Sequence, residues 1–106
     1  MEEVTLLPAS GTTVTELADS IAINVSGGVK VKLRAAGRWA INQMTKALAK
    51  AKIRLAWKGI QIVWDSSFAT EKGKRDGDDI VVIETKIYVV NEGKLEERYE
   101  IPTKDL

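Results

Sequence analysis

Residues 29–35 of the chain, with the sequence VKVKLRA, alternate strictly between apolar and basic side chains. Successive side chains of a β-strand point to opposite faces of the sheet, so this stretch predicts a strand with one buried and one wet face. The buried face is expected to hold Val29, Val31, Leu33 and Ala35. The wet face is expected to hold Lys30, Lys32 and Arg34. Because an apolar sheet face must be covered by another layer, the strand constrains the chain to a layered fold.

Two stretches with helical periodicity can supply the covering layer. The first is 14–25, where a capping box of Thr13 and Glu16 marks the start and the SGG at 26–28 marks the end. The second runs from about 38 to 51 and follows the strand directly. Its predicted core-facing arc holds Ile41, Met44, Leu48 and Ala51, with Ala40 and Ala47 beside them. The opposite arc holds Trp39, Gln43, Lys46 and Lys50.

Three further stretches predict strands, at 3–7, 60–69 and 80–90. One face of the second of these is expected to hold Ile60, Ile62, Trp64 and Phe68. The polar segment TEKGKRDGDD at 70–79 suits a hairpin arm between the last two strands. The order β-α-β-α-β-β predicts an α+β two-layer sandwich, with both helices on one face of a four-stranded mixed sheet.

The chain of 106 residues has the length of one domain, which we predict to span 1–91. Residues 92–106 then form an acidic C-terminal extension, with a candidate extra strand at 95–101. The acidic start MEEV does not resemble a signal peptide, and no apolar run approaches the roughly 20 residues that span a bilayer. We therefore expect a cytoplasmic protein with no membrane partner.

Cysteine and histidine are both absent. Their absence excludes disulfides, thiolate nucleophiles, imidazole bases and conventional structural zinc sites. The sequence also has no phosphate-binding P-loop, no nucleophile elbow and no carboxylate pair that would share a face. We therefore predict that the protein is not an enzyme and that it has no catalytic residue, metal site or cofactor.

The formal net charge of +1 hides an asymmetric distribution. No acidic residue lies between Asp19 and Asp65, a window that contains nine cations: Lys30, Lys32, Arg34, Arg38, Lys46, Lys50, Lys52, Arg54 and Lys58. One interpretation is an ordinary solvated surface. The other is a continuous cationic surface that produces a local positive field for an anionic partner. The charges alone leave both open.

The segment AAGRWAINQMTKALAKA at 35–51 resembles the stage V sporulation protein S family, which belongs to the Alba superfamily of small nucleic-acid-binding proteins. The matching positions are Gly37, Ala40, Ile41, Asn42, Gln43, Lys46, Ala47, Leu48, Ala49 and Ala51. Further similar positions are Ala56, Gly59, Ile60, Ile62 and Phe68, so the resemblance covers roughly 14–90. It implies an Alba-like sandwich whose last strand lies between two others. Segment 95–101 is therefore expected to cross to another sheet edge or to a partner subunit.

The resemblance also implies a homodimer whose two hairpin arms grip DNA or RNA, and a nucleoid association if the ligand is DNA. On that basis Arg38 and Lys46 contact phosphates, while Asn42 and Gln43 donate to phosphates or read base edges. Trp39, if exposed, stacks on an unpaired base. The complete predicted site comprises Arg34, Arg38, Trp39, Asn42, Gln43, Lys46, Lys50, Lys72, Lys74 and Arg75.

Structural roles for several of these residues stay open. Asn42 can hydrogen-bond to a preceding loop, and Trp39 can cap the helix or lie in a dimer interface. Lys50, like Lys52 after it, can serve the negative end of the helix dipole. The basic strand face can pair with the acidic tail at 96–100. The alternative function is a regulatory or scaffolding protein whose basic strip binds an acidic partner protein.

Overall fold

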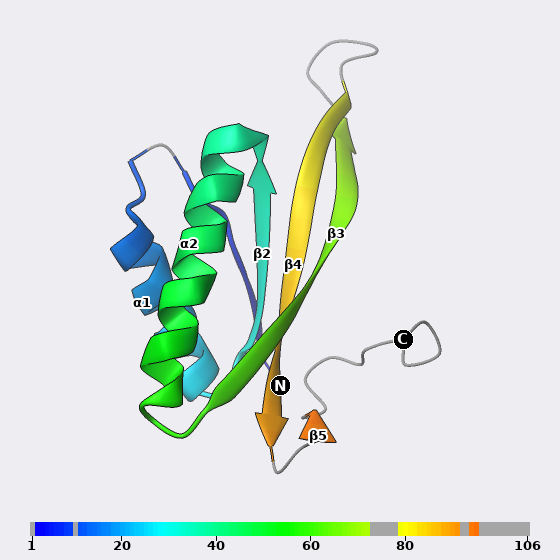
Figure 1. Cartoon of the computed structure of the whole chain (residues 1–106). Helices are drawn as coiled ribbons and strands as arrows, with labels where there is room; N and C mark the ends of the chain where they lie inside the picture. Colours follow the sequence, from blue (N-terminus) through cyan, green and yellow to red (C-terminus); the bar gives the residue numbers. More distant parts are fainter. Residues whose placement is uncertain (1, 10, 73–78, 92–93, 96–106) are drawn as a thin grey trace.

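The chain folds into two layers, a mixed β-sheet and a pair of helices that cover one of its faces (Figure 1). The computed structural model describes residues 2–9, 11–72, 79–91 and 94–95. Its elements are β1 (Glu3–Leu6), α1 (Val14–Ser26), β2 (Lys30–Ala36), α2 (Gly37–Ala56), β3 (Gln61–Lys72), β4 (Asp79–Asn91) and β5 (Lys94–Leu95). The predicted element order and the α+β sandwich are confirmed.

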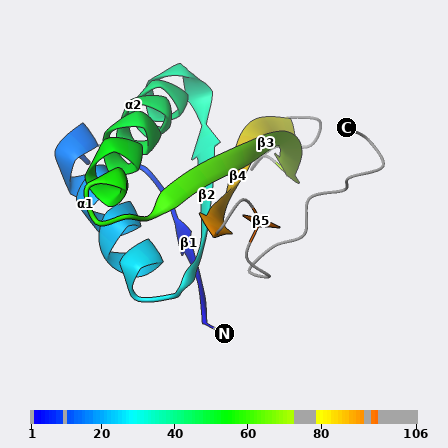
Figure 2. The ribbon, with the colours of Figure 1, turned by 60° about the horizontal axis from the view of Figure 1, so that its bottom comes forward.

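The four main strands lie in the order β1-β2-β4-β3. β1 pairs with β2 in parallel, and β4 pairs antiparallel with both β2 and β3. The sheet is therefore mixed, as predicted, and the last of the four strands in the sequence lies inside the sheet. Figure 2 shows both helices on the same side of this sheet.

The core forms where the alternating strand meets the two helices. Val31, Leu33 and Ala35 of β2 are buried, whereas the residues between them are only partly buried. The helices contribute the buried residues Leu17, Ala18, Ile21, Ala22 and Val25 from α1 and Ala40, Met44, Ala47, Leu48, Ala51 and Leu55 from α2. The side chain of Thr13 accepts a hydrogen bond from the backbone N–H of Glu16, which confirms the predicted helix start.

The second helix is longer than its predicted range of about 38–51 and continues to Ala56. The apolar stripe continues through Leu55, and no glycine or proline interrupts it before Gly59, where φ is +78°. Among the described residues, no helix has the length and apolar character needed to cross a membrane.

The hairpin of β3 and β4 extends beyond the helix layer (Figure 1). This extension determines the exposure of Phe68, whose predicted face is confirmed. Phe68 shares a sheet face with the buried Ile62, as the alternation predicts, yet its side chain is 80% exposed. The helices cover the start of β3 and do not reach Phe68. The alternation of side chains therefore shows which face Phe68 lies on but does not show whether that part of the face is covered.

The C-terminal strand also differs from its prediction. β5 pairs directly with β4, through Asn91 opposite Lys94 and Val90 opposite Leu95. The pairing of β2 with β4 stops at Lys86, so the end of β4 has a free edge that β5 occupies. At Leu95, the one described residue of the predicted strand 95–101, the chain therefore pairs with β4 and not with another edge of the sheet. Residues 96–106 lie outside the described residues.

Candidate nucleic-acid interface

The junction of β2 and α2 creates a helix start without a side-chain cap. Ala36 occupies the N-cap position in an extended conformation, and among the described residues no side chain hydrogen-bonds to cap it. Gly37 has a φ of +84°, a conformation that glycine adopts without steric cost. The first backbone N–H groups of a helix have no intrahelical acceptor and carry its positive partial charge. The uncapped end can therefore receive an anion.

Basic and polar side chains continue from this end along the outer face of α2. Arg38, Asn42 and Lys46 are exposed and follow one another at four-residue spacing. Residues at this spacing lie on one face of a helix, so the three side chains form a row. Within the described part of the chain, neither Arg38 nor Lys46 has an ion-pair partner. We call these three residues the α2 row.

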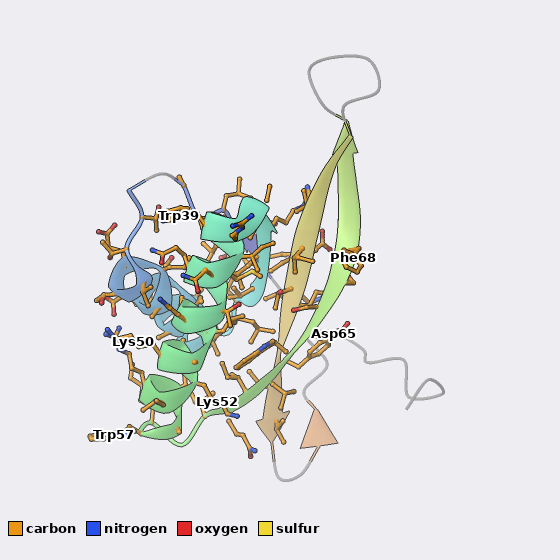
Figure 3. All side chains as sticks on the ribbon, turned by 45° about the horizontal axis from the view of Figure 1, so that its top comes forward. Trp39, Lys50, Lys52, Trp57, Asp65 and Phe68 are labelled. Carbon is orange, nitrogen blue, oxygen red and sulfur yellow. The ribbon has the colours of Figure 1, made fainter. Side chains whose placement is uncertain are left out.

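Trp39 lies beside the α2 row, in the first turn of the helix. Its side chain is 48% exposed, which confirms that it lies off the core side of α2. Figure 3 shows Trp39 at the end where α2 begins, far from Trp57 at the other end. The ring is therefore accessible next to the uncapped helix start.

Gln43 and Lys50 connect α2 to the segment around the start of α1. The Gln43 Nε2 donates to the carbonyl oxygen of Thr12 at 3.0 Å. The Lys50 Nζ donates to the Thr15 hydroxyl at 2.8 Å. The sequence left open a hydrogen bond from Asn42 to the preceding loop. In the structure, Gln43 makes a loop hydrogen bond of this kind. Of these two predicted site residues, Lys50 therefore links the two helices, and Gln43 links α2 to the loop before α1.

Arg34 lies on the opposite face of the sheet from α2. The Arg34 Nε is 3.4 Å from a Glu84 carboxylate oxygen, across the pairing of β2 with β4. Lys32 lies 3.5 Å from Glu3 and 3.9 Å from Glu84. The prediction of one continuous cationic surface is therefore wrong for this strand. Carboxylates from neighbouring strands offset its charges, and the sheet separates them from the α2 row.

The C-terminal half of α2 also has partners within the chain. Arg54 forms an ion pair with Asp19 of α1. The Lys52 ammonium lies 5.8 Å from the centroid of the Trp64 ring, within the range of a cation–π contact. The solvent-facing positive charge of α2 therefore lies mainly in the N-terminal half of the helix.

The open face of the sheet includes Tyr88, a titratable residue whose pKa is shifted. Tyr88 is buried there, opposite Val63 of β3. Burial raises the pKa of the Tyr88 phenol above its usual value, and the negative charge of Asp65 raises it further. Tyr88 therefore stays neutral at physiological pH and adds no charge to this face.

The hairpin arm is present, but its basic residues are described only in part. Lys72 is the last residue of β3 and pairs with Asp79, the first residue of β4. Nothing is described of the Lys72 side chain, and Lys74 and Arg75 lie outside the described residues. Their predicted contacts with nucleic acid stay predictions.

The absence of a capping side chain at the start of α2 could have been predicted from the sequence. Serine, threonine, aspartate and asparagine are the preferred N-cap residues, and the AAG at 35–37 contains none of them. The first predicted helix, by contrast, begins with a clear capping box. The difference between the two helix starts points to Ala36 as a position where the chain leaves backbone N–H groups available.

The family model of stage V sporulation protein S matches residues 4–90. A solved structure of Alba from Thermoplasma volcanium is similar, with 14% sequence identity and a TM-score of 0.49. The similarity covers 79% of this chain and 98% of that chain. No curated protein matches this chain.

Proposed function

This chain belongs to the stage V sporulation protein S family, and on that premise we propose that it is a non-enzymatic protein that binds the phosphate backbone of DNA or RNA. The observation that carries the proposal is the uncapped start of α2 together with the exposed Arg38. Backbone N–H groups at a helix start, reinforced by the helix dipole, form a natural phosphate-binding site. Arg38 adds a side chain suited to bidentate hydrogen bonds with a phosphate.

The α2 row extends this site along the helix. Arg38 and Lys46 are eight residues apart, which corresponds to about 12 Å at the helical rise per residue. A nucleic-acid strand advances about 3.4 Å per nucleotide, so the row can follow a backbone over several phosphates. Asn42, between the two cations, can donate to the same backbone. Such contacts position a nucleic acid without reading its sequence.

Trp39 and the hairpin arm would complete the interface. An exposed indole next to a phosphate site can stack on an unpaired base, typically for about 1–3 kcal/mol per base. Lys72, Lys74 and Arg75 would reach along or into a groove. We propose a homodimer, which would present two such interfaces, and a cytoplasmic location with nucleoid association if the ligand is DNA.

Fluorescence anisotropy of labelled duplex DNA and single-stranded RNA, measured across a salt series, tests the proposal. We expect log K to fall linearly with log salt concentration, because each neutralised phosphate releases counterions. Arg38→Gln should weaken binding and reduce the magnitude of the slope by about one. Lys52→Gln is the matched control, since it removes the same charge from the other end of α2 and should have little effect.

Two outcomes would count against the proposal. Equal effects of Arg38→Gln and Lys52→Gln would show that binding depends on overall charge and not on the start of α2. No binding at low salt to either ligand would favour the alternative function, a regulatory or scaffolding protein that binds an acidic partner.

A further inference from the structure

An apolar groove lies between the C-terminal parts of α1 and α2, at the far end of α2 from Trp39. Figure 3 shows Trp57 at this end of the helix. The volume of the groove is about 550 Å³. It is lined by Asp19, Ala22 and Ile23 of α1 and by Ile53, Arg54, Trp57 and Lys58 from the end of α2 and the turn after it. We call this surface the α1/α2 groove.

The walls of the α1/α2 groove are apolar and face solvent. The exposed fraction is 70% for Ile23, 62% for Ile53 and 88% for Trp57. Ala22 is buried and also lines the groove, so its methyl group belongs to the floor. Single exposed apolar residues are common on proteins, but a contiguous group of this kind marks a binding surface.

The fold itself does not require an indole at position 57. Backbone hydrogen bonds close the ends of both helices: the Trp57 N–H donates to the Ile53 carbonyl, and the Gly27 N–H donates to the Ile23 carbonyl. The Trp57 side chain therefore contributes little to ending α2, and a ligand that covers it explains its position better. Because these carbonyls already have donors, the polar groups left for a ligand are charged side chains at the rim of the groove.

Those charged side chains favour an anionic ligand. The lining contains one carboxylate and two cations, and the carboxylate of Asp19 already forms an ion pair with Arg54. Lys58 is exposed, and within the described part of the chain it has no ion-pair partner. The α1/α2 groove therefore presents one unpaired cation beside apolar walls. This combination complements a ligand that has an apolar body and one negative charge.

The size of the α1/α2 groove favours a small ligand over a protein partner. Small-molecule sites are concave, have volumes of roughly 300–1,000 Å³, and are mostly apolar with a few polar groups. The groove, at about 550 Å³, lies within that range. A standard protein interface takes about 20–30 residues from each partner. The few residues that line the groove suit a ligand that enters it.

We infer that the α1/α2 groove binds a single-chain anionic amphiphile, namely a free long-chain carboxylate. Its alkyl chain lies between Ile23 and Ile53 and against the Trp57 ring, and its carboxylate lies at Lys58. The inference does not depend on the proposed function. Because the α2 row begins at the opposite end of the helix, a ligand in the groove leaves Arg38 open to a phosphate.

Isothermal titration calorimetry with dodecanoate, below its micelle concentration, tests the inference. We expect one ligand per chain. The affinity should fall by up to about four-fold for each methylene group removed in decanoate and octanoate, because each buried methylene contributes to binding. Ile23→Ser should weaken the binding of every chain length, since it removes part of one wall. Leu7→Ser is the matched control, because Leu7 is 66% exposed outside the groove and should leave the affinity unchanged.

A second substitution tests the charge and uses an exposed residue, so that folding is not at stake. Lys58→Gln should weaken dodecanoate binding by about two- to five-fold, the range of an exposed ion pair. It should leave the affinity for uncharged 1-dodecanol unchanged. Lys52→Gln removes the same charge from an exposed position outside the groove and should not affect dodecanoate.

Three outcomes would overturn the inference. The first is no binding of dodecanoate by the wild-type chain. The second is equal weakening by Ile23→Ser and Leu7→Ser, which would show nonspecific adsorption. The third is binding to phosphatidylglycerol vesicles without binding of monomeric dodecanoate, which would assign the surface to a membrane. Arg38→Gln should leave dodecanoate binding intact, so a failure of the proposed function is distinguishable from a failure of this inference.

Discussion

Gln43 of α2 and Thr12 of the loop before α1 are joined by a hydrogen bond of 3.0 Å, from the Gln43 side-chain amide to the Thr12 carbonyl oxygen. The two residues are 31 positions apart in the sequence. The bond fixes the loop against the same helix end that carries Arg38 and Trp39. The two residues of the Asn-Gln pair therefore differ in role. Gln43 stabilises the fold, and Asn42 remains exposed.

We first predict that Gln43→Met lowers the free energy of unfolding by about 1 kcal/mol. The substitution keeps the length and helix propensity of the side chain but leaves the part-buried Thr12 carbonyl without this donor. Urea unfolding measures the effect. Asn42→Met is the matched control, and it should preserve stability while weakening nucleic-acid binding. Equal stability of the two variants would contradict the structural role of Gln43.

A second prediction concerns the uncapped start of α2. Ala36→Ser should stabilise the protein by about 1 kcal/mol, because the hydroxyl can accept a hydrogen bond from a first-turn N–H group. That shift corresponds to roughly 4–8 °C in Tm for a domain near this size. The same substitution should weaken phosphate binding, since the hydroxyl competes for the N–H groups. Calorimetry and anisotropy measure the two effects.

Ala36→Val is the control for that experiment. Valine suits the extended backbone of Ala36 but has no oxygen that could cap the helix. It should neither stabilise α2 in this way nor compete with phosphate. Tighter nucleic-acid binding by Ala36→Ser would argue that the helix start is not the phosphate site.

The third prediction follows from Tyr88, whose pKa in the folded protein is raised above 10.0. An acid with a raised folded-state pKa favours folding while it is protonated. Its contribution is therefore constant below pH 10 and is lost as the pH rises from 10 through the folded-state pKa. Tyr88→Phe should remove this part of the alkaline loss. Urea unfolding at pH 8 to 12 measures it, and parallel curves for the two proteins would contradict the assignment.

The fourth prediction compares two apolar residues that share a face of β3. Ile62→Ala should cost about 2–5 kcal/mol, because Ile62 is fully buried. Phe68→Ala should change the stability of the isolated chain by less than about 0.5 kcal/mol, since the helix layer leaves Phe68 exposed. Chemical unfolding at low protein concentration measures both. A large loss from Phe68→Ala at that concentration would contradict the exposed position.

The local patterns predicted the fold well, because they report directly on burial. The alternation at 29–35 predicted the buried residues of β2, and helical spacing predicted the core stripe of α2. Patterns could not give the distance over which the helices cover β3, which depends on how far the hairpin extends. They also could not show the edge of β4 that β5 occupies, since that edge depends on where β2 ends.

The candidate site was harder to predict, because charges close in sequence lie on different faces. Arg34 and Arg38 are four residues apart, yet the chain passes from strand to helix between them. Arg34 then finds Glu84, a carboxylate 50 positions away that the local sequence does not reveal. The apolar groove between the C-terminal parts of α1 and α2 was missed for a related reason. Ile53 and Trp57 lie beyond the predicted end of the helix, so their proximity to Ile23 depends on its true length.

The central place of β4 has a consequence for synthesis on the ribosome. β4 is formed by Asp79–Asn91, so the first four elements emerge well before the strand that must pair with β2. Until then the nascent chain presents an unpaired edge, which is a hazard for aggregation. Lys30, Lys32 and Arg34 lie along that edge. Like-charge repulsion between nascent chains would oppose pairing of two such edges, so the basic residues of β2 can reduce aggregation until β4 completes the sheet.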